Sequence, residues 1–212
     1  MMHKSFSAAA SLALALLAPA QADAQQSYDA REVRLLPIYC KYTQIFRDHV
    51  PGGNDPAQID YYTKTMGTTF IHMHHYCWGL MNVNRASFIS RTQQDRASNL
   101  FRSVQEFDYV LERAPVDFPY VPEILTRKGE SLIRLDKGPE AVGTLQRAIT
   151  TKPDYWPPYA ALSDYYKDSG DVAKARDWLE KGLSASPDSQ VLARRLAELK
   201  RTSAAHTKTK ER

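Results

Sequence analysis

Signatures of catalysis and of membrane insertion are missing from this chain of 212 residues. It contains no glycine-rich phosphate loop, no Gly-x-Ser-x-Gly nucleophile elbow, no Cys-x-x-Cys pair and no paired-acid motif. Its apolar N-terminal run is well short of the ~20 residues that a membrane-spanning helix needs. We therefore expect a non-catalytic protein without stable membrane insertion, built as one helical domain.

The first 24 residues have the three parts of a secretory signal peptide. Lys4 provides the short positive start, an apolar core follows from about Ala8 to Ala18, and small-x-small sites end at Ala22 and Ala24. Cleavage near residue 22 or 24 is expected rather than an uncleaved anchor. A lipid anchor is not indicated, because no cysteine stands at the cleavage point. The sequence predicts export, to the periplasm if the source is a Gram-negative bacterium.

Cysteine is scarce, since Cys40 and Cys77 are the only two. Both belong to the exported part of the chain, and an isolated pair in an oxidising compartment is most simply a disulfide. The bond would join an N-terminal helix expected at Leu36–Val50 to the helix that contains Cys77, across the loop Pro51–Pro56. In the chain-entropy model such a cross-link stabilises a fold by about 3–4 kcal/mol.

Neither sign of charge dominates, because 28 lysines and arginines face 24 acidic residues and leave a net charge of +4. The basic residues mostly alternate with acidic ones, and export separates the protein from the chromosome, so no nucleic-acid partner is expected. The tail around Lys208, Lys210 and Arg212 is basic and is expected to be a frayed, solubilising end. Contact with anionic lipid or with an acidic partner is the alternative for this tail.

A repeat of 34 residues is the strongest positive feature of the chain. It relates the segments 122–155 and 156–189, and 34 residues is the period of a helix-turn-helix repeat array. Small residues in these segments would let two antiparallel helices approach closely, with an apolar stripe between them. The landmarks are Ala141 with Ala175, Ala148 with Gly182, and Pro153 with Pro187.

Both segments resemble the tetratricopeptide repeat, although Lys128 stands where that family has leucine. The resemblance implies an all-α, right-handed helical solenoid whose concave face is lined mainly by the first helix of each repeat. The residues that match the repeat pattern in the first copy are Leu125, Gly129, Leu132, Ala141, Leu145, Ala148 and Pro153. Those in the second copy are Tyr159, Leu162, Ser163, Tyr166, Ala175, Leu179, Gly182 and Pro187.

A degenerate third unit precedes these two, because Ala114 and Pro119 repeat the spacing of the later copies. Its helices are expected at about Thr68–Arg85 and Thr92–Arg113. A terminal capping helix is expected from Gln190 to Lys200. The whole plan is a signal peptide (1–24), an N-terminal non-repeat helical segment (25–67), tetratricopeptide-like repeats (68–189, comprising 68–121, 122–155 and 156–189), and a capping helix with a basic tail (190–212).

Three of the six histidines, His72, His74 and His75, cluster beside Cys77. Copper or zinc could be held by His74 with Cys77, or by His72 with His75 and a residue from elsewhere in the chain. Cys77 could not ligate if it is oxidised, and no recognised ligand spacing is present, so we expect no metal or other cofactor and assign these side chains to packing. A histidine acting as a base near Asp60, Tyr61 or Tyr62 is the remaining catalytic alternative.

The resemblance places a partner-binding groove on the first helices of the repeats. A Lys and Asn clamp for a free carboxyl terminus is absent, so we expect a helix or extended segment of an envelope or secreted protein as the partner. The predicted function is that of an exported adaptor or assembly factor, with periplasmic metal binding as the alternative and the oligomeric state open. Tyr155, Trp156 and Tyr159 are candidates for an aromatic anchor at the groove edge. The expected groove residues are Glu123, Thr126, Arg127, Glu130, Arg134, Ala160, Asp164 and Lys167.

Overall fold

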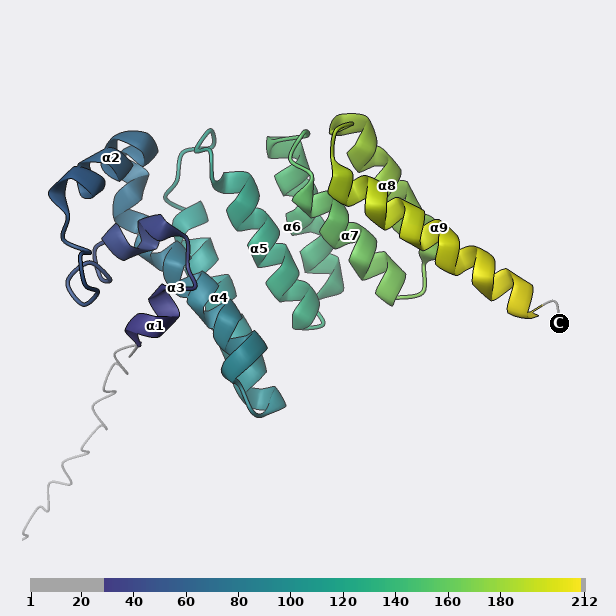
Figure 1. Cartoon of the computed structure of the whole chain (residues 1–212), viewed down its shortest axis with the longest axis horizontal. Coiled ribbons are helices and arrows are strands. Elements are labelled where there is room, and N and C mark those ends of the chain that lie inside the picture. The colour runs from purple at the N-terminus through teal and green to yellow at the C-terminus, as the bar shows by residue number, and fades with distance from the viewer. Residues whose placement is uncertain (1–28, 211–212) are drawn as a thin grey trace, which may run out of the picture.

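The computed structural model describes residues 29–210, with side chains up to 202, and every regular element in this range is helical (Figure 1). The all-α class is therefore confirmed for this part of the chain, whereas the expected signal peptide lies outside it. Within the same range, no helix is both long and apolar enough to cross a membrane. The elements are α1 (Ala30–Val33), η1 (Ile38–Tyr42), α2 (Pro56–Met66), η2 (Gly67–His72), α3 (Met73–Asn84), η3 (Arg85–Ile89), α4 (Gln93–Leu111), α5 (Val121–Arg134), α6 (Gly138–Thr151), α7 (Pro157–Asp168), α8 (Val172–Ala185) and α9 (Gln190–Lys210).

The longer helices pack one after another as antiparallel pairs along the long axis of the molecule (Figure 1). The pairs are α3 with α4, α5 with α6, and α7 with α8, and α9 packs against α8. Each pair also contacts the next, since α4 packs on α5 and α6 packs on α7. Helix α5 in addition touches both α3 and α7, and Asp164 of α7 pairs with Arg195 of α9. We call α3, α5, α7 and α9 the row of odd-numbered helices.

Small side chains set the distance between helices within and between the pairs. A Cβ atom added to Gly129 would lie 2.6 Å from Leu145 Cγ, so α5 and α6 approach too closely there for any larger residue. A Cβ atom on Gly182 would lie 2.7 Å from Leu192 Cδ1 and 2.9 Å from Tyr159 Cβ. Because packed interiors have few voids, these contacts leave little freedom in the crossing of the helices.

Helix boundaries follow local capping signals. Thr92 caps α4 by accepting a hydrogen bond from the Asp95 backbone N–H, as expected for a helix that starts there. Asp171 caps α8 in the same way through the Lys174 N–H. Helix α9 extends to Lys210, past Lys200 where the capping helix was expected to end and into the expected frayed tail.

The N-terminal helix expected at Leu36–Val50 is not formed, and that prediction is wrong. A short 3₁₀ helix, η1, replaces it and ends at Tyr42. The next residue, Thr43, has an extended backbone, and its hydroxyl donates to the Cys40 carbonyl at 2.8 Å. Threonine side chains compete with helical backbone bonding in this manner. Tyr39, Cys40 and Tyr42 are all buried in the hydrophobic core. Tertiary packing therefore decides this segment.

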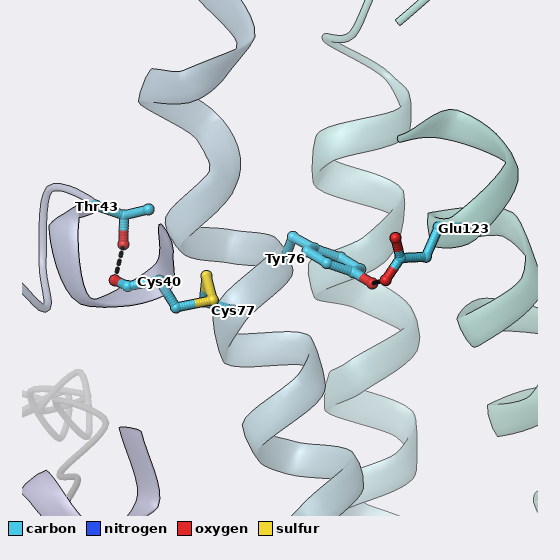
Figure 2. Close-up of a disulfide and its surroundings, with 5 residues drawn as sticks. All are labelled: Cys40, Thr43, Tyr76, Cys77 and Glu123. Atoms are coloured by element: carbon cyan, nitrogen blue, oxygen red, sulfur yellow. Dashed lines mark hydrogen bonds between the residues drawn. A yellow bond between two sulfur atoms is a disulfide. The ribbon is translucent and has the colours of Figure 1, made fainter. Parts of the chain in front are cut away.

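The disulfide between Cys40 and Cys77 is present, as the sequence predicted (Figure 2). It joins η1 to the middle of α3, and both cysteines are fully buried. The adjacent residue, Tyr76, extends from α3 in another direction and donates a hydrogen bond to Glu123 of α5 at 2.6 Å (Figure 2). Consecutive residues of α3 thus fasten the N-terminal segment and the following helix pair. A buried disulfide is typical of proteins that fold in an oxidising compartment.

Replacing Gly79 with alanine tests the close contact between α3 and α4. The new Cβ atom would lie 2.3 Å from Cε1 of Phe107, a fully buried ring with no room to move aside. We expect the free energy of unfolding to fall by about 1–3 kcal/mol in urea titrations. Gly143→Ala is the matched control, because that glycine is exposed within α6 and nothing lies within 4 Å of an added Cβ. It should stabilise by about 0.5–1 kcal/mol, and equal stability of both variants would contradict this packing.

Replacing Cys40 and Cys77 together with alanine tests the role of the disulfide. The free energy of unfolding should fall by about 3–4 kcal/mol, because the unfolded chain loses a cross-link. Hydrogen exchange should show faster exchange of the amides of η1, while the amides of α8, which has no contact with the bond, remain protected. A uniform loss of protection across both elements would show that the disulfide does not act locally.

Candidate binding face

One face of the molecule is formed by the row of odd-numbered helices and by the N-terminal segment. Helix α9 passes in front of α8 in Figure 1, and the segment around η1 crosses in front of α3. Tyr39 of η1 contacts Tyr120 at the start of α5 with ring centroids 5.6 Å apart, so this segment reaches the edge of α5. We call the surface of α5, α7 and α9 beyond that contact the binding face.

Most of the predicted groove residues lie on the surface, but two do not. Thr126 is only 2% exposed and donates its hydroxyl to the Pro122 carbonyl, and Ala160 is only 4% exposed. Their expected exposure is wrong, because each lies on the side of its helix that packs against the neighbouring helices. Arg127, Arg134 and Lys167 are exposed. Glu123, Glu130 and Asp164 are half-buried.

A group of four tyrosines surrounds Glu123 where α5 begins. We call Tyr39, Tyr76, Tyr120, Tyr155 and Glu123 the tyrosine–carboxylate cluster. They come from η1, from α3, from the start of α5 and from the turn before α7, so distant parts of the chain assemble it. Tyr39 and Tyr76 are buried, whereas the other three are half-buried.

Burial keeps the cluster's phenols protonated. It raises the pKa of Tyr76 well above its ordinary value, and the charges of Tyr39 and Glu123 add to this effect. Burial, followed by the charge of Glu123, likewise raises the pKa of Tyr155 to about 12. These hydroxyls are neutral at physiological pH and act as hydrogen-bond donors and acceptors. Tyr76 uses its proton for the short bond to Glu123.

Arg127 lies next to this cluster but forms its ion pair with a different carboxylate. Its Nη1 donates to Glu130 Oε2 at 3.1 Å, one helical turn along α5. Among the described residues, no lysine or arginine forms an ion pair with Glu123. The cluster therefore combines a half-buried negative charge with neutral hydroxyl groups.

A second feature of the binding face is a hollow of about 530 Å³ between α7 and α9. Asp164 pairs with Arg195 of α9 across this hollow, and Lys167 Nζ lies 3.8 Å from Asp164 Oδ1. Its lining carries charges of both signs. The contribution of α9 through Arg195 was not predicted. The lining residues are Ser163, Asp164, Lys167, Leu179, Arg194, Arg195, Glu198, Leu199 and Thr202.

The histidine cluster lies at the junction of η2 and α3 and packs against α4. His75 Nδ1 is 2.6 Å from Glu106 Oε2, and its ring stacks on Tyr109 at a centroid distance of 3.5 Å. His74 Nδ1 bonds the Ile71 carbonyl at 2.9 Å. The rings of His74 and His75 lie 4.3 Å apart.

The metal hypothesis loses one of its four ligands, because Cys77 is in the disulfide and offers no thiolate. Across the residues whose side chains are described, no group of three or more His, Cys, Asp or Glu residues is arranged to hold a metal ion. The residues named for the catalytic alternative have other contacts. Asp60 pairs with Lys64 at 2.6 Å, and Tyr62 stacks on Tyr42.

Sequence reasoning missed the tyrosine–carboxylate cluster as a unit. Glu123 and Tyr155 were each singled out, but Tyr39 and Tyr120 carried no motif. The abundance of tyrosine, 12 in 212 residues, was the available signal. It could not show which rings converge, because residues from 39 to 155 meet there only in the folded chain.

Comparison of the chain with protein-family models gives no match, and no curated protein matches it at a significant level.

Burial of His74 predicts a loss of stability in mild acid. Burial, followed by the nearby His75, lowers the pKa of His74 to about 4 from its ordinary value of 6.5. Between these two pH values the unfolded chain binds a proton that the folded chain does not. Stability is therefore complete above pH 6.5 and declines by up to about 3 kcal/mol as the pH falls to 4. Urea titrations from pH 7.5 to 4 should show a shallower decline for His74→Gln, and parallel profiles would contradict this assignment.

Proposed function

We propose that this chain is a tetratricopeptide-like helical repeat protein that acts as a non-catalytic adaptor. In this proposal the pairs α5/α6 and α7/α8 are successive repeats, α3/α4 is a degenerate one, and α9 is a capping helix, within a right-handed solenoid. The equivalent small residues support this assignment, since Ala141 and Ala175 are both fully buried and Ala148 and Gly182 are both buried. A shared period in sequence thus coincides with a shared packing role.

The observation that carries the adaptor proposal is the accessible row of α5, α7 and α9. It presents half-buried aromatic rings next to charged side chains of both signs. Aromatic anchors with a polar rim are typical of protein-binding surfaces. The α7–α9 hollow is comparable in size to sites that hold single side chains or small ligands. The proposed partner is a helix or extended segment of an exported protein.

The proposed compartment is the periplasm of a Gram-negative bacterium, reached after cleavage of residues 1–24. The fully buried Cys40–Cys77 disulfide supports an oxidising environment, because such bonds are rare in reducing cytosol. The amino-terminal sequence supports export independently.

Site-specific photo-crosslinking in the native envelope tests the adaptor proposal. A photoreactive amino acid would replace Arg134 or Lys167 on the binding face, and Arg147 or Glu180 on the exposed surfaces of α6 and α8 as matched controls. We expect the two face positions to yield the same adduct, identified by mass spectrometry, and the controls to yield none. The purified partner should then bind wild-type protein at least tenfold more tightly than Lys167→Glu. Equal adducts from both surfaces would contradict the proposal.

A further inference from the structure

We infer that Glu123 and the tyrosines around it receive a basic side chain, lysine or arginine, from the docked segment of the partner protein. The inference rests on the proposed function, because it assumes that a protein segment docks on the binding face. It goes further by naming the chemistry of the anchor. Two features of the tyrosine–carboxylate cluster support it: a carboxylate without a direct ion pair among the described residues and a set of aromatic rings.

The first feature is the charge of Glu123. Its hydrogen-bond partner in the described chain is the neutral Tyr76 hydroxyl at 2.6 Å. The neighbouring Arg127 donates to Glu130, so this arginine acts on Glu123 only through space. Glu123 therefore lacks a direct ion pair within the described chain, and a cation from outside would supply one as a charge-assisted hydrogen bond.

The second feature is the aromatic surroundings. The rings of Tyr39 and Tyr120 meet edge to face at 5.6 Å, and Tyr120 contacts Phe118 at 5.5 Å. Tyr120 and Tyr155 are half-buried and lie close enough to Glu123 for its charge to raise the pKa of each, after the larger effect of burial. Aromatic faces attract cations, and they also pack well against the apolar stem of a lysine or arginine.

Charge and shape favour a protein segment over a small free cation. The aromatic surface continues from Tyr39 to Tyr62 at 6.0 Å and on to the exposed Tyr61 at 5.0 Å, beyond the reach of a single small ion. In the other direction the binding face continues to the α7–α9 hollow. An extended partner segment can contact the surface on both sides of Glu123. The basic group is therefore a side chain within a longer peptide and not a free small cation.

Selection from a phage-displayed library of random 12-residue peptides tests the inference. The library would be panned on the purified mature protein, on Glu123→Gln, and on Glu140→Gln. Glu140 is the matched control because it is an exposed glutamate on α6, 3.8 Å from Lys137 and away from the binding face. Circular dichroism and thermal melts of each variant would establish that it is folded.

We expect wild-type protein and Glu140→Gln to select peptides with a lysine or arginine at one fixed position, flanked by apolar or aromatic residues. The synthetic peptides should bind Glu123→Gln at least tenfold more weakly. Replacing the basic peptide residue with norleucine should cause a similar loss in wild-type protein and little further loss in Glu123→Gln. That non-additivity would connect the two groups directly.

Other outcomes separate this inference from the proposed function. Peptides that respond to Lys167→Glu but lack a basic residue, or bind Glu123→Gln undiminished, overturn the inference and leave the adaptor proposal standing. Binding of N-acetyl-arginine amide as tight as that of the peptides also overturns it, because the site would then take a small cation. Failure to select any peptide that responds to substitutions on α5 or α7 counts against both.

Discussion

Helix α3 connects the two parts of this molecule through two consecutive residues. Cys77 bonds covalently to Cys40 in η1, and Tyr76 donates its hydroxyl proton to Glu123 in α5 (Figure 2). Neighbouring helix positions point about 100° apart, so one short stretch can hold elements on two sides. Phe107 of α4 packs onto Gly79 of α3. If α3 shifted, the N-terminal segment, the second helix of its own pair and the next pair would all lose their contacts.

This arrangement determines where the proposed binding face begins. Because the disulfide holds η1 in place, Tyr39 reaches Tyr120 and covers the end of the row of odd-numbered helices. The accessible part of the row starts at Glu123 and continues over α7 and α9. The disulfide is fully buried, so its role is to hold this edge permanently rather than to respond to solvent.

Charge pairing within the face also influences what can bind there. Asp164 pairs with Arg195, and Arg127 pairs with Glu130, so these groups are already partly neutralised. Exposed pairs of this kind contribute little to stability and can exchange partners easily. Glu123 differs because its bonded partner is a neutral hydroxyl in a more buried setting. The specificity of the face for a partner would then depend mainly on this one carboxylate and its rings.

The sequence by itself determined the helical class, the pairing of α5 with α6 and of α7 with α8, and the disulfide. Helix periodicity and capping residues act over short distances, and an isolated pair of cysteines admits one pairing. Sequence reasoning failed for Leu36–Val50, where packing of the short 3₁₀ helix into the core outweighs formation of a longer local helix. The prediction that Thr126 and Ala160 are exposed was also wrong, because the position of a residue on its own helix does not show which neighbouring helices cover it. Only the tertiary structure brought Tyr39, Tyr76 and Tyr155 around Glu123, because no local pattern encodes contacts between residues so far apart in the chain.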